Sequence, residues 1–577
     1  MALHYFKEFT MLNWHLPSGS LQKLSLLDYI FLATLLWLAF YLGCGSYAIL
    51  DMNEGLYAEI AREMLEQQQY LIPQLNYVPY LEKPPLLYWL IALSYQLFGI
   101  TEFAARLVPS TCAVLACLSL VWFGKRVGQP RVGWLAAVIL ASSFGFILIG
   151  RTVFFDMLLV LCLWLSLWCF YLWYQTDKRS YLRVAYAGLA GGLLTKGLVA
   201  LVFPASIAVI FLLTEPCGWR KRLQLFDGWS LLLFFIIATP WHLLASLKQP
   251  HFAWDYFINE QFYRFLDKRI PNDYHTGPIY FYLPFILAYL FPWCLLLPVL
   301  RKISLKDPLQ KFLGLGFLLP LIFYSISKAK GDYYMVVGMP PLALLLALFL
   351  TRQLEKGKIL AVKWIFLGLA GLALVLLALL YYVNWPSLPQ FSLLNPLKLS
   401  TELKQSIGWL MVVSCGYLTL ASLACLTKRG VLLPVFGLAG FSVLMVNIYI
   451  YTRQIQQNSY SQKHVAQYLL AHADKQPVYL YQDFERLSSV LFYVRERLAI
   501  IDSQSQDLYF GSHTPAAKDW FITGDDFLQQ AKQQPQYIVM RTDRLTDFNQ
   551  LMAKRLTVTP VFLSKRATIV KVQALRN

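Results

Sequence analysis

The sequence predicts an all-α, polytopic membrane domain followed by a small α/β domain, and composition gives the first indication. Of the 577 residues, 58% are hydrophobic and only 14% are charged. Soluble domains are about 45–50% apolar and about 25% charged, so this composition excludes a typical soluble protein, a disordered chain and a disulfide scaffold. The net charge of +18 does not indicate nucleic acid, because basic residues also collect in the cytoplasmic loops of membrane proteins.

The second indication is the spacing of apolar segments. Segments of about 17–25 apolar residues are long enough to span a bilayer as helices. We count about thirteen, at 27–46, 104–124, 132–150, 154–175, 181–195, 197–214, 228–247, 277–299, 311–327, 335–351, 362–384, 406–426 and 431–452. The fifth and sixth are short and could form one helical hairpin. The first is of spanning length without a small-residue cleavage site, so we expect an uncleaved anchor.

The third indication is the distribution of basic residues. With a cytoplasmic N-terminus, every one of the six inside connections is basic, as in Lys125, Arg126 and Arg131. Lysine and arginine favour the cytoplasmic side, so the pattern predicts that the C-terminal region lies outside. Residues 86–99 are apolar as well, but fourteen residues are few for a span. We expect them to form an interfacial or re-entrant helix in a first outer loop, about 47–103, with another such helix near 57–67.

The composition changes after residue 452. Short β-type runs, among them VYLY (478–481), VLFYV (490–494) and TIVKV (568–572), alternate with helical stretches. This pattern is typical of a small α/β domain. We therefore divide the chain into a membrane domain, 1–452, and an outer α/β domain, 453–577. The nine cysteines lie in or beside apolar segments without metal-ligand spacing, which predicts neither a disulfide nor a zinc site.

Some charges in the outer connections are not explained by topology. Ionisable groups at membrane depth are costly and usually line a polar cavity or a substrate pathway. The candidates are Asp51, Glu54, Glu82, Lys83, Asp156, Lys196, Glu260, Arg264, Lys328 and Lys330. A cavity with both carboxylates and cations at the outer leaflet suits a substrate that has a phosphate and a site of proton transfer.

Each candidate also has a purely structural explanation. Asp156 could cap a helix. Lys196 could be a snorkelling lysine, although it would then extend to the outer side, where lysine and arginine are disfavoured. Lys328 and Lys330 could be ordinary interfacial charges. The segment Glu82-Lys83-Pro84-Pro85 could simply begin the helix at 86–99, or Lys83 and free backbone N–H groups could cradle a phosphate there.

Seven motifs, all on the same predicted side, resemble those of integral-membrane glycosyltransferases that use polyprenyl-phosphate sugars. They are DMNEGLYAEIAREML (51–65), YLEKPPLLYW (80–89), RTVFFDMLLV (151–160), LLTKGLVAL (193–201), TPWHLLA (239–245), FINEQFYRF (257–265) and SKAKGDYYM (327–335). The sequence looks most like the bacterial aminoarabinose transferases that modify lipid A, and more distantly like protein O-mannosyltransferases. The resemblance covers about residues 25–350 well and the remainder in layout only.

The resemblance implies a GT-C type fold and an inverting transfer at the periplasmic face of the inner membrane. The expected donor is a sugar on polyprenyl (undecaprenyl) phosphate, with aminoarabinose and lipid A as the best guesses for sugar and acceptor. Among partners we expect membrane lipids and no nucleic acid; we expect a monomer, and no cofactor is required. An alternative is O-glycosylation of a protein or envelope glycan. A more distant alternative is a lipid or polysaccharide transporter, although its charges would follow a path through the membrane.

The same motifs imply roles for individual residues. Lys83, Lys196 and Arg264, and with them Lys328 and Lys330, would bind the donor phosphate and stabilise the charge that develops on the leaving group. Asp51 or Glu54 would act as a base in catalysis, and Asp156 would hold a cationic or polar partner. The remaining cavity-lining residues would be Asn53, Tyr57, Tyr80, Glu82, Glu260 and Tyr334.

Three positions depart from the family pattern. Asn53 stands where relatives have the aspartate of an Asp-Glu pair, and an asparagine cannot accept a proton. Either Glu54 or Asp51 is then the base, or the acceptor is an anionic phosphate oxygen that needs little base assistance, or the chain is impaired. Leu56 replaces an arginine, and Gln261 replaces a histidine. Since that histidine is a proposed metal ligand beside Glu82, we expect no bound metal.

Overall fold

The computed structural model describes residues 23–272, 276–355, 371, 433–473, 476–552 and 555–575. The predicted spans at 362–384 and 406–426 lie outside these ranges. Each of the other eleven predicted spans coincides with a helix or with a pair of helices that follow each other closely.

Five helical segments within the described ranges are long and apolar enough to cross a membrane. They are Glu102–Arg126 (α5), Asp156–Thr176 (α8), Trp219–Lys248 (α11, Trp219–Leu223, with α12, Gly228–Lys248), Pro308–Ile326 (α14) and Asp332–Gln353 (η5, Asp332–Gly338, with most of α15, Met339–Glu355). Two bent pairs raise this number to seven if each is one span: Pro130–Ala141 (α6) with Phe144–Gly150 (α7), and Tyr282–Leu290 (α13) with Trp293–Lys302 (η4). The chain is therefore a multi-pass membrane protein, and the length criterion alone does not reach thirteen spans.

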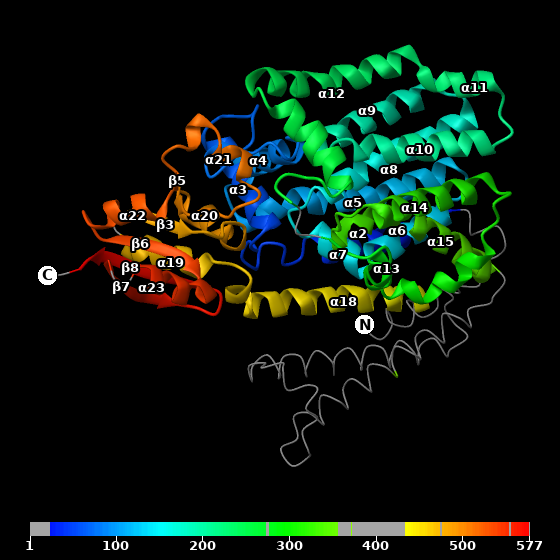
Figure 1. The fold of residues 1–577 in the computed structure, drawn as a ribbon. Coiled ribbons are helices and arrows are strands. Elements are labelled where there is room, and N and C mark those ends of the chain that lie inside the picture. The colour runs from blue at the N-terminus through cyan, green and yellow to red at the C-terminus, as the bar shows by residue number, and fades with distance from the viewer. Residues whose placement is uncertain are drawn as a thin grey trace.

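Four further helices belong to the membrane domain. They are Leu26–Phe40 (α2), Arg179–Lys196 (α9), Val199–Thr214 (α10) and Leu433–Ile455 (α18). Figure 1 shows the long helices lying side by side, with the C-terminal domain at one end of the bundle and α18 leading to it. The N-terminus of α2 is fixed by a capping box of Ser25 and Asp28, and Asp28 also forms a buried ion pair with Arg131 of α6 at 2.7 Å.

The segment predicted to form the first outer loop contains two helices. They are Asn53–Glu66 (α3) and Leu86–Phe98 (α4), and between them lies an antiparallel pair of short strands, Gln74–Leu75 (β1) and Val78–Pro79 (β2). With thirteen residues, α4 is too short to cross a bilayer alone. Figure 1 shows both helices between the bundle and the C-terminal domain.

The C-terminal domain is built on one six-stranded sheet with the order β5-β4-β3-β6-β8-β7. The strands are Val478–Tyr481 (β3), Ala499–Ile501 (β4), Phe521–Ile522 (β5), Gln536–Arg541 (β6), Leu556–Leu563 (β7) and Ala567–Ala574 (β8). The first four in this order are parallel, and β8 runs antiparallel to both of its neighbours. The accompanying helices are Lys463–His472 (α19), Ser489–Val494 (α20), Tyr509–Ser512 (α21), Gly524–Ala531 (α22) and Leu545–Met552 (α23).

The run VLFYV (490–494) forms helix α20, where the sequence predicted a strand. Val490, Leu491, Phe492 and Val494 are all buried, and α20 packs against α3 and α19. A short run that is apolar on every side does not distinguish a buried helix from a buried strand, because it has no periodicity.

Polar contacts join the C-terminal domain to the first outer loop. Asp51 accepts hydrogen bonds from Ser489 at the start of α20 and from Gln462. Glu102 pairs with Lys463 at 2.7 Å and accepts a hydrogen bond from Tyr493. The domain is thereby fixed over one end of the bundle.

Candidate active site

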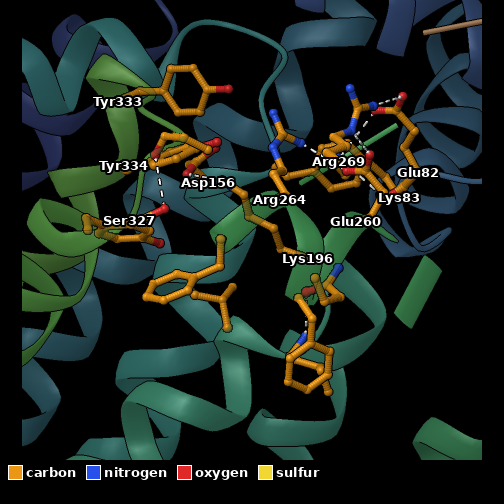
Figure 2. Close-up of a pocket in the computed structure, with 18 of the residues that line it drawn as sticks. Glu82, Lys83, Asp156, Lys196, Glu260, Arg264, Arg269, Ser327, Tyr333 and Tyr334 are labelled. Atoms are coloured by element: carbon orange, nitrogen blue, oxygen red, sulfur yellow. Dashed lines mark hydrogen bonds and ion pairs between the residues drawn. The ribbon is translucent and has the colours of Figure 1, made fainter. Parts of the chain in front are cut away.

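A cavity of about 460 Å³ lies between the bundle, the first outer loop and the C-terminal domain. Its wall combines segments that are far apart in the sequence: the start of α3, the turn before α4, the start of α8, the junction of α9 and α10, the π-helix Trp254–Tyr263 (η3) with the turn after it, and the α14–η5 connection. Two residues of the C-terminal domain complete it. Figure 2 shows the charged side chains of the wall facing this space.

One charged group of the wall is the pair of Asp156 and Lys196. Asp156 is the first residue of α8, directly after the N-cap residue Phe155, whose side chain makes no capping hydrogen bond. Its Oδ1 lies 2.7 Å from the Nζ of Lys196, the last residue of α9. The same ammonium lies 4.6 Å from the ring centre of Tyr334 and 5.3 Å from that of Tyr333. Lysine and aspartate therefore hold each other in position at the cavity surface, and the aromatic rings favour the cation.

Gly197 makes this position of Lys196 possible. Its φ of +83° is in the left-handed region, and an added Cβ would lie 2.7 Å from both Gln261 Nε2 and Tyr256 Oη. The Oε1 of Gln261 accepts a hydrogen bond from the backbone N–H of Leu198 at 3.2 Å. Gln261 thus supports the start of α10. Within the described ranges, no group of three metal-ligating side chains is found.

The second charged group consists of Glu82, Lys83, Glu260, Arg264 and Arg269 (Figure 2). Arg269 bridges the two glutamates, with its Nη2 2.6 Å from Glu82 and its Nε donating to Glu260. The Oε2 of Glu260 also lies 3.0 Å from the Nη1 of Arg264 and 3.5 Å from the Nζ of Lys83. Burial disfavours the ionised form of Glu260, but Lys83, Arg269 and Arg264 outweigh it and hold its pKa below the usual range. The glutamate is therefore an anion that orients three cations.

Much of the remaining wall is apolar. It includes Leu198 just before α10, Val199 and Val202 of α10, Phe262, Phe265 and Leu266 on or after η3, and Phe323 of α14. Several of these side chains also face the outside of the protein, since Phe262 is 55%, Leu266 54% and Val202 42% exposed. The charged part of the cavity is thus continuous with an apolar surface at the side of the bundle.

The cavity brings together nine of the residues predicted from the sequence. They are Asn53, Tyr57, Glu82, Lys83, Asp156, Lys196, Glu260, Arg264 and Tyr334. Tyr80 lies behind the wall, with its hydroxyl 3.4 Å from Glu82. Lys330 is buried and donates to the carbonyls of Tyr324 and Ser325 at the end of α14, whereas Lys328 is exposed. Neither of these two lysines belongs to the cavity wall.

Asp51 and Glu54 do not line the cavity either. Both carboxylate oxygens of Glu54 accept hydrogen bonds from Arg106 of α5, at 2.9 and 2.8 Å, in a fully buried pair. Its oxygens also accept the backbone N–H groups of Leu50 and Val153. Asp51 is engaged with Ser489 and the C-terminal domain. Both carboxylates join structural elements, and their role as a base stays a prediction.

Three polar residues of the wall are not among the predicted site residues: Arg269, which the sequence shows only as one of several charges of the loop 248–276, and Gln506 and Asp507. Arg269 follows Lys268 directly, and spacing does not tell which of two adjacent cations turns inward. Gln506 and Asp507 lie in a polar loop of another domain and belong to no motif. Only the docking of that domain brings them to the cavity.

Comparison with known proteins gives a consistent family. A family model described as dolichyl-phosphate-mannose-protein mannosyltransferase matches residues 82–243. An undecaprenyl phosphate-alpha-4-amino-4-deoxy-L-arabinose arabinosyl transferase of Pseudomonas savastanoi is 32% identical over 370 residues, which are 60% of this chain and 67% of that protein. The enzyme with the same name from Aeromonas hydrophila is 29% identical over 516 residues, 85% and 90% of the two chains. The match to arabinosyl transferase 2 of Pseudomonas fluorescens, 31% identical over 60% of this chain, spans 63% of that relative, less than two thirds.

The fold supports the same assignment. The crystal structure of ArnT from Cupriavidus metallidurans bound to undecaprenyl phosphate superimposes with a TM-score of 0.80 at 23% identity, over 94% of this chain and 97% of that one. This likeness establishes an ArnT-like GT-C fold. Together with the sequence relatives, it shows that the chain belongs to the family of undecaprenyl phosphate-aminoarabinose arabinosyltransferases, membrane glycosyltransferases of the GT-C type.

Proposed function

We propose that the protein is an inverting glycosyltransferase that moves 4-amino-4-deoxy-L-arabinose from undecaprenyl phosphate to lipid A. The observation that carries the proposal is a single cavity with two groups of cations and an adjoining apolar wall. A polyprenyl-phosphate sugar has the matching parts: an anionic phosphate, a polar sugar and a long apolar chain. The names of the family members indicate the same donor.

The phosphate of the donor is the leaving group of this reaction. Lys196 on one side and Lys83 and Arg264 on the other are the side chains that would hold it. Their carboxylate partners hold them in position before the substrate arrives. Cations placed in advance stabilise the negative charge that develops as the glycosidic bond breaks, without a cost of reorganisation during the reaction.

The polyprenyl chain would leave the cavity along the apolar wall. Val202, Phe262 and Leu266 of this wall are exposed, and the proposed route places them against the lipid tails. Such a route lets the phosphate enter from the bilayer while the lipid remains in it.

The acceptor is proposed to be an anionic phosphate oxygen of lipid A. In the cavity, Asn53 occupies the position of the relatives' aspartate, and the hydroxyl of Tyr57 lies 3.4 Å from its Oδ1. An amide orients an acceptor but does not remove a proton. An ionised phosphate oxygen is already a nucleophile, so little base catalysis is needed.

The topology that accompanies this function has about thirteen spans in the inner membrane and a cytoplasmic N-terminus. The membrane domain, 1–452, then carries the periplasmic domain, 453–577, on its outer face. A reporter fused after residue 577 should be active in the periplasm, and activity only in the cytoplasm would refute this orientation.

The function is tested with purified protein, undecaprenyl-phosphate aminoarabinose and lipid A, with the product measured by mass spectrometry. We expect modified lipid A from the wild type and from Lys328→Met, an exposed lysine outside the cavity. Lys83→Met should abolish the product although the protein is still made. Transfer to protein or glycan acceptors without any transfer to lipid A would favour the O-glycosyltransferase alternative, in line with the family description.

A further inference from the structure

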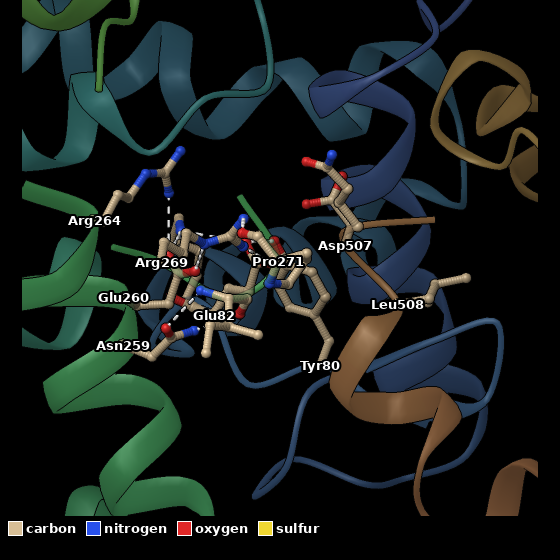
Figure 3. A network of polar contacts seen from close by, with 12 residues as sticks. Tyr80, Glu82, Asn259, Glu260, Arg264, Arg269, Pro271, Asp507 and Leu508 are labelled. Atoms are coloured by element: carbon tan, nitrogen blue, oxygen red, sulfur yellow. Dashed lines mark hydrogen bonds and ion pairs between the residues drawn. The ribbon is translucent and has the colours of Figure 1, made fainter. Parts of the chain in front are cut away.

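A loop of the C-terminal domain supplies part of the cavity wall. Gln506 and Asp507 lie just before α21 and line the same cavity as Asn53, Tyr57 and Glu82. Figure 3 shows Asp507 close to the group formed by Glu82, Glu260 and Arg269, with no dashed line to its carboxylate. The proposed phosphate-binding role uses neither of the two residues.

The loop is held rigidly by one carboxylate behind it. The Oε1 of Glu485 accepts hydrogen bonds from the hydroxyl of Ser505 at 2.6 Å and from the backbone N–H groups of Gln506 at 2.9 Å and Asp507 at 3.1 Å. Ser505 in turn accepts the N–H of Leu508 at 3.0 Å. Because these contacts use the backbone, the side chains of Gln506 and Asp507 remain available to the cavity.

Both side chains carry acceptors without a donor among the described residues. The carboxylate of Asp507 takes part in no hydrogen bond or ion pair with any of them, and the Oε1 of Gln506 is buried without a partner. Buried polar groups are almost always paired, so an orphaned one calls for an explanation. Two neighbouring acceptors that face a cavity would be satisfied by a ligand group that is rich in donors.

The charges around Asp507 favour a positive ligand group. Burial raises the pKa of Asp507 well above its usual range, and the nearby carboxylates of Glu82 and Glu485 raise it further. Arg269 and Lys83 oppose this effect, but both are already engaged with Glu82 and Glu260. A further cation at this place would pair with the one carboxylate that lacks a partner.

We propose that Gln506 and Asp507 bind a protonated amine on the sugar of the donor, so that the C-terminal domain selects for an amino sugar. This inference rests on the proposed function, since it concerns the donor of the same reaction. An ammonium brings three donors and a positive charge, whereas a hydroxyl brings one donor and no charge. A phosphate in this position would be repelled by the carboxylate.

The test compares two donors that differ in one group: undecaprenyl-phosphate aminoarabinose, and the same donor with a hydroxyl in place of the amine. Wild type, Asp507→Asn and a control, Asp525→Asn, are compared; the control changes an 89% exposed carboxylate of the same domain. We expect Asp507→Asn to lower kcat/KM for the amine donor by about 10- to 100-fold, as for a lost charged hydrogen bond. Its kcat/KM for the hydroxyl donor should stay near that of the wild type.

Other outcomes overturn the inference. An equal loss with both donors would assign Asp507 to proton transfer or to structure, and an unchanged preference would exclude any contact with the amine. Binding of both donors, measured by native mass spectrometry, gives a readout that does not need turnover. If the wild type binds but does not transfer, the proposed function fails while the binding preference still decides the role of Asp507. If it binds neither donor, both proposals fail.

Discussion

Replacing Asp51 by asparagine should stabilise the protein above pH 7 and leave transfer intact. Asp51 lies at the junction of the first outer loop and the C-terminal domain. Its Oδ1 accepts hydrogen bonds from the backbone N–H and hydroxyl of Ser489, at 3.2 and 2.5 Å, and its Oδ2 accepts one from Gln462 at 2.8 Å. Both carboxylate oxygens of Asp51 therefore have hydrogen-bond donors. The residue destabilises the fold only because its negative charge is partly removed from water.

The cost of that charge follows from the pKa of Asp51. Burial raises the pKa from 3.8 to about 7, although the hydrogen bonds from Ser489 and Gln462 lower it. A raised pKa means that the neutral acid suits the folded state, so stability is complete below about pH 4 and is lost as the pH rises through about 7. The full difference between these two pKa values corresponds to about 4 kcal/mol of unfolding free energy. Because the side chain is only half-buried, we expect a loss of about 1–3 kcal/mol.

Asparagine avoids this loss while it keeps the contacts. Its Oδ1 can still accept from Ser489, and its new N–H can donate to the Oε1 of Gln462 after that amide rotates. The Oε1 of Gln462 is buried without a donor in the present arrangement, so the rotation gives it a partner.

The assay is thermal unfolding in detergent, followed by intrinsic fluorescence at pH 5 and pH 8. The melting temperature of the wild type should fall between these pH values, and that of Asp51→Asn should fall less. Equal pH dependence of the two proteins would refute the reasoning. Loss of transfer by a folded Asp51→Asn protein would instead identify Asp51 as the base.

Three other substitutions test separate parts of the account. Glu54→Gln leaves Arg106 as a buried, uncompensated charge and should destabilise the protein by about 3–5 kcal/mol; a wild-type elution profile and yield in size-exclusion chromatography would argue against this structural role. Lys196→Met should lower kcat for transfer by about 100- to 1000-fold, the usual loss when one charge-stabilising group is removed, with Lys328→Met as the control; equal rates in both would remove Lys196 from the phosphate site. Asn53→Asp should change the transfer rate by less than about 10-fold if the acceptor oxygen is already ionised, whereas a much larger increase would show that the chain lacks a needed base.

Sorting charges by predicted side of the membrane placed Lys83, Lys196 and Arg264 among the candidates, and the resemblance to the glycosyltransferases singled them out as phosphate-binding residues. The topology of a membrane protein explains its inner cations, so the cations left on the outer side are few and stand out. The same sorting does not tell where an outer side chain points. Lys330 satisfies the carbonyls at the end of α14, and Lys328, two residues away, remains exposed.

Contacts between distant segments could not be predicted from the sequence. Glu54 lies in a motif that resembles a catalytic loop. In the structure, however, Arg106, fifty-two positions later, donates hydrogen bonds to both carboxylate oxygens of Glu54. Gln506 and Asp507 reach the cavity because contacts such as those of Asp51 and Glu102 fix the C-terminal domain over it. The place of these side chains in the cavity depends on how the two domains dock, which no local sequence pattern indicates.

The most direct test of the account is a cryo-electron microscopy structure of the protein in a lipid nanodisc with undecaprenyl phosphate bound. We predict that the phosphate lies within hydrogen-bonding distance of Lys83, Lys196 and Arg264, and that the lipid chain leaves along Val202 and Phe262. A phosphate bound elsewhere, with these three cations still paired only to their carboxylates, would contradict the account.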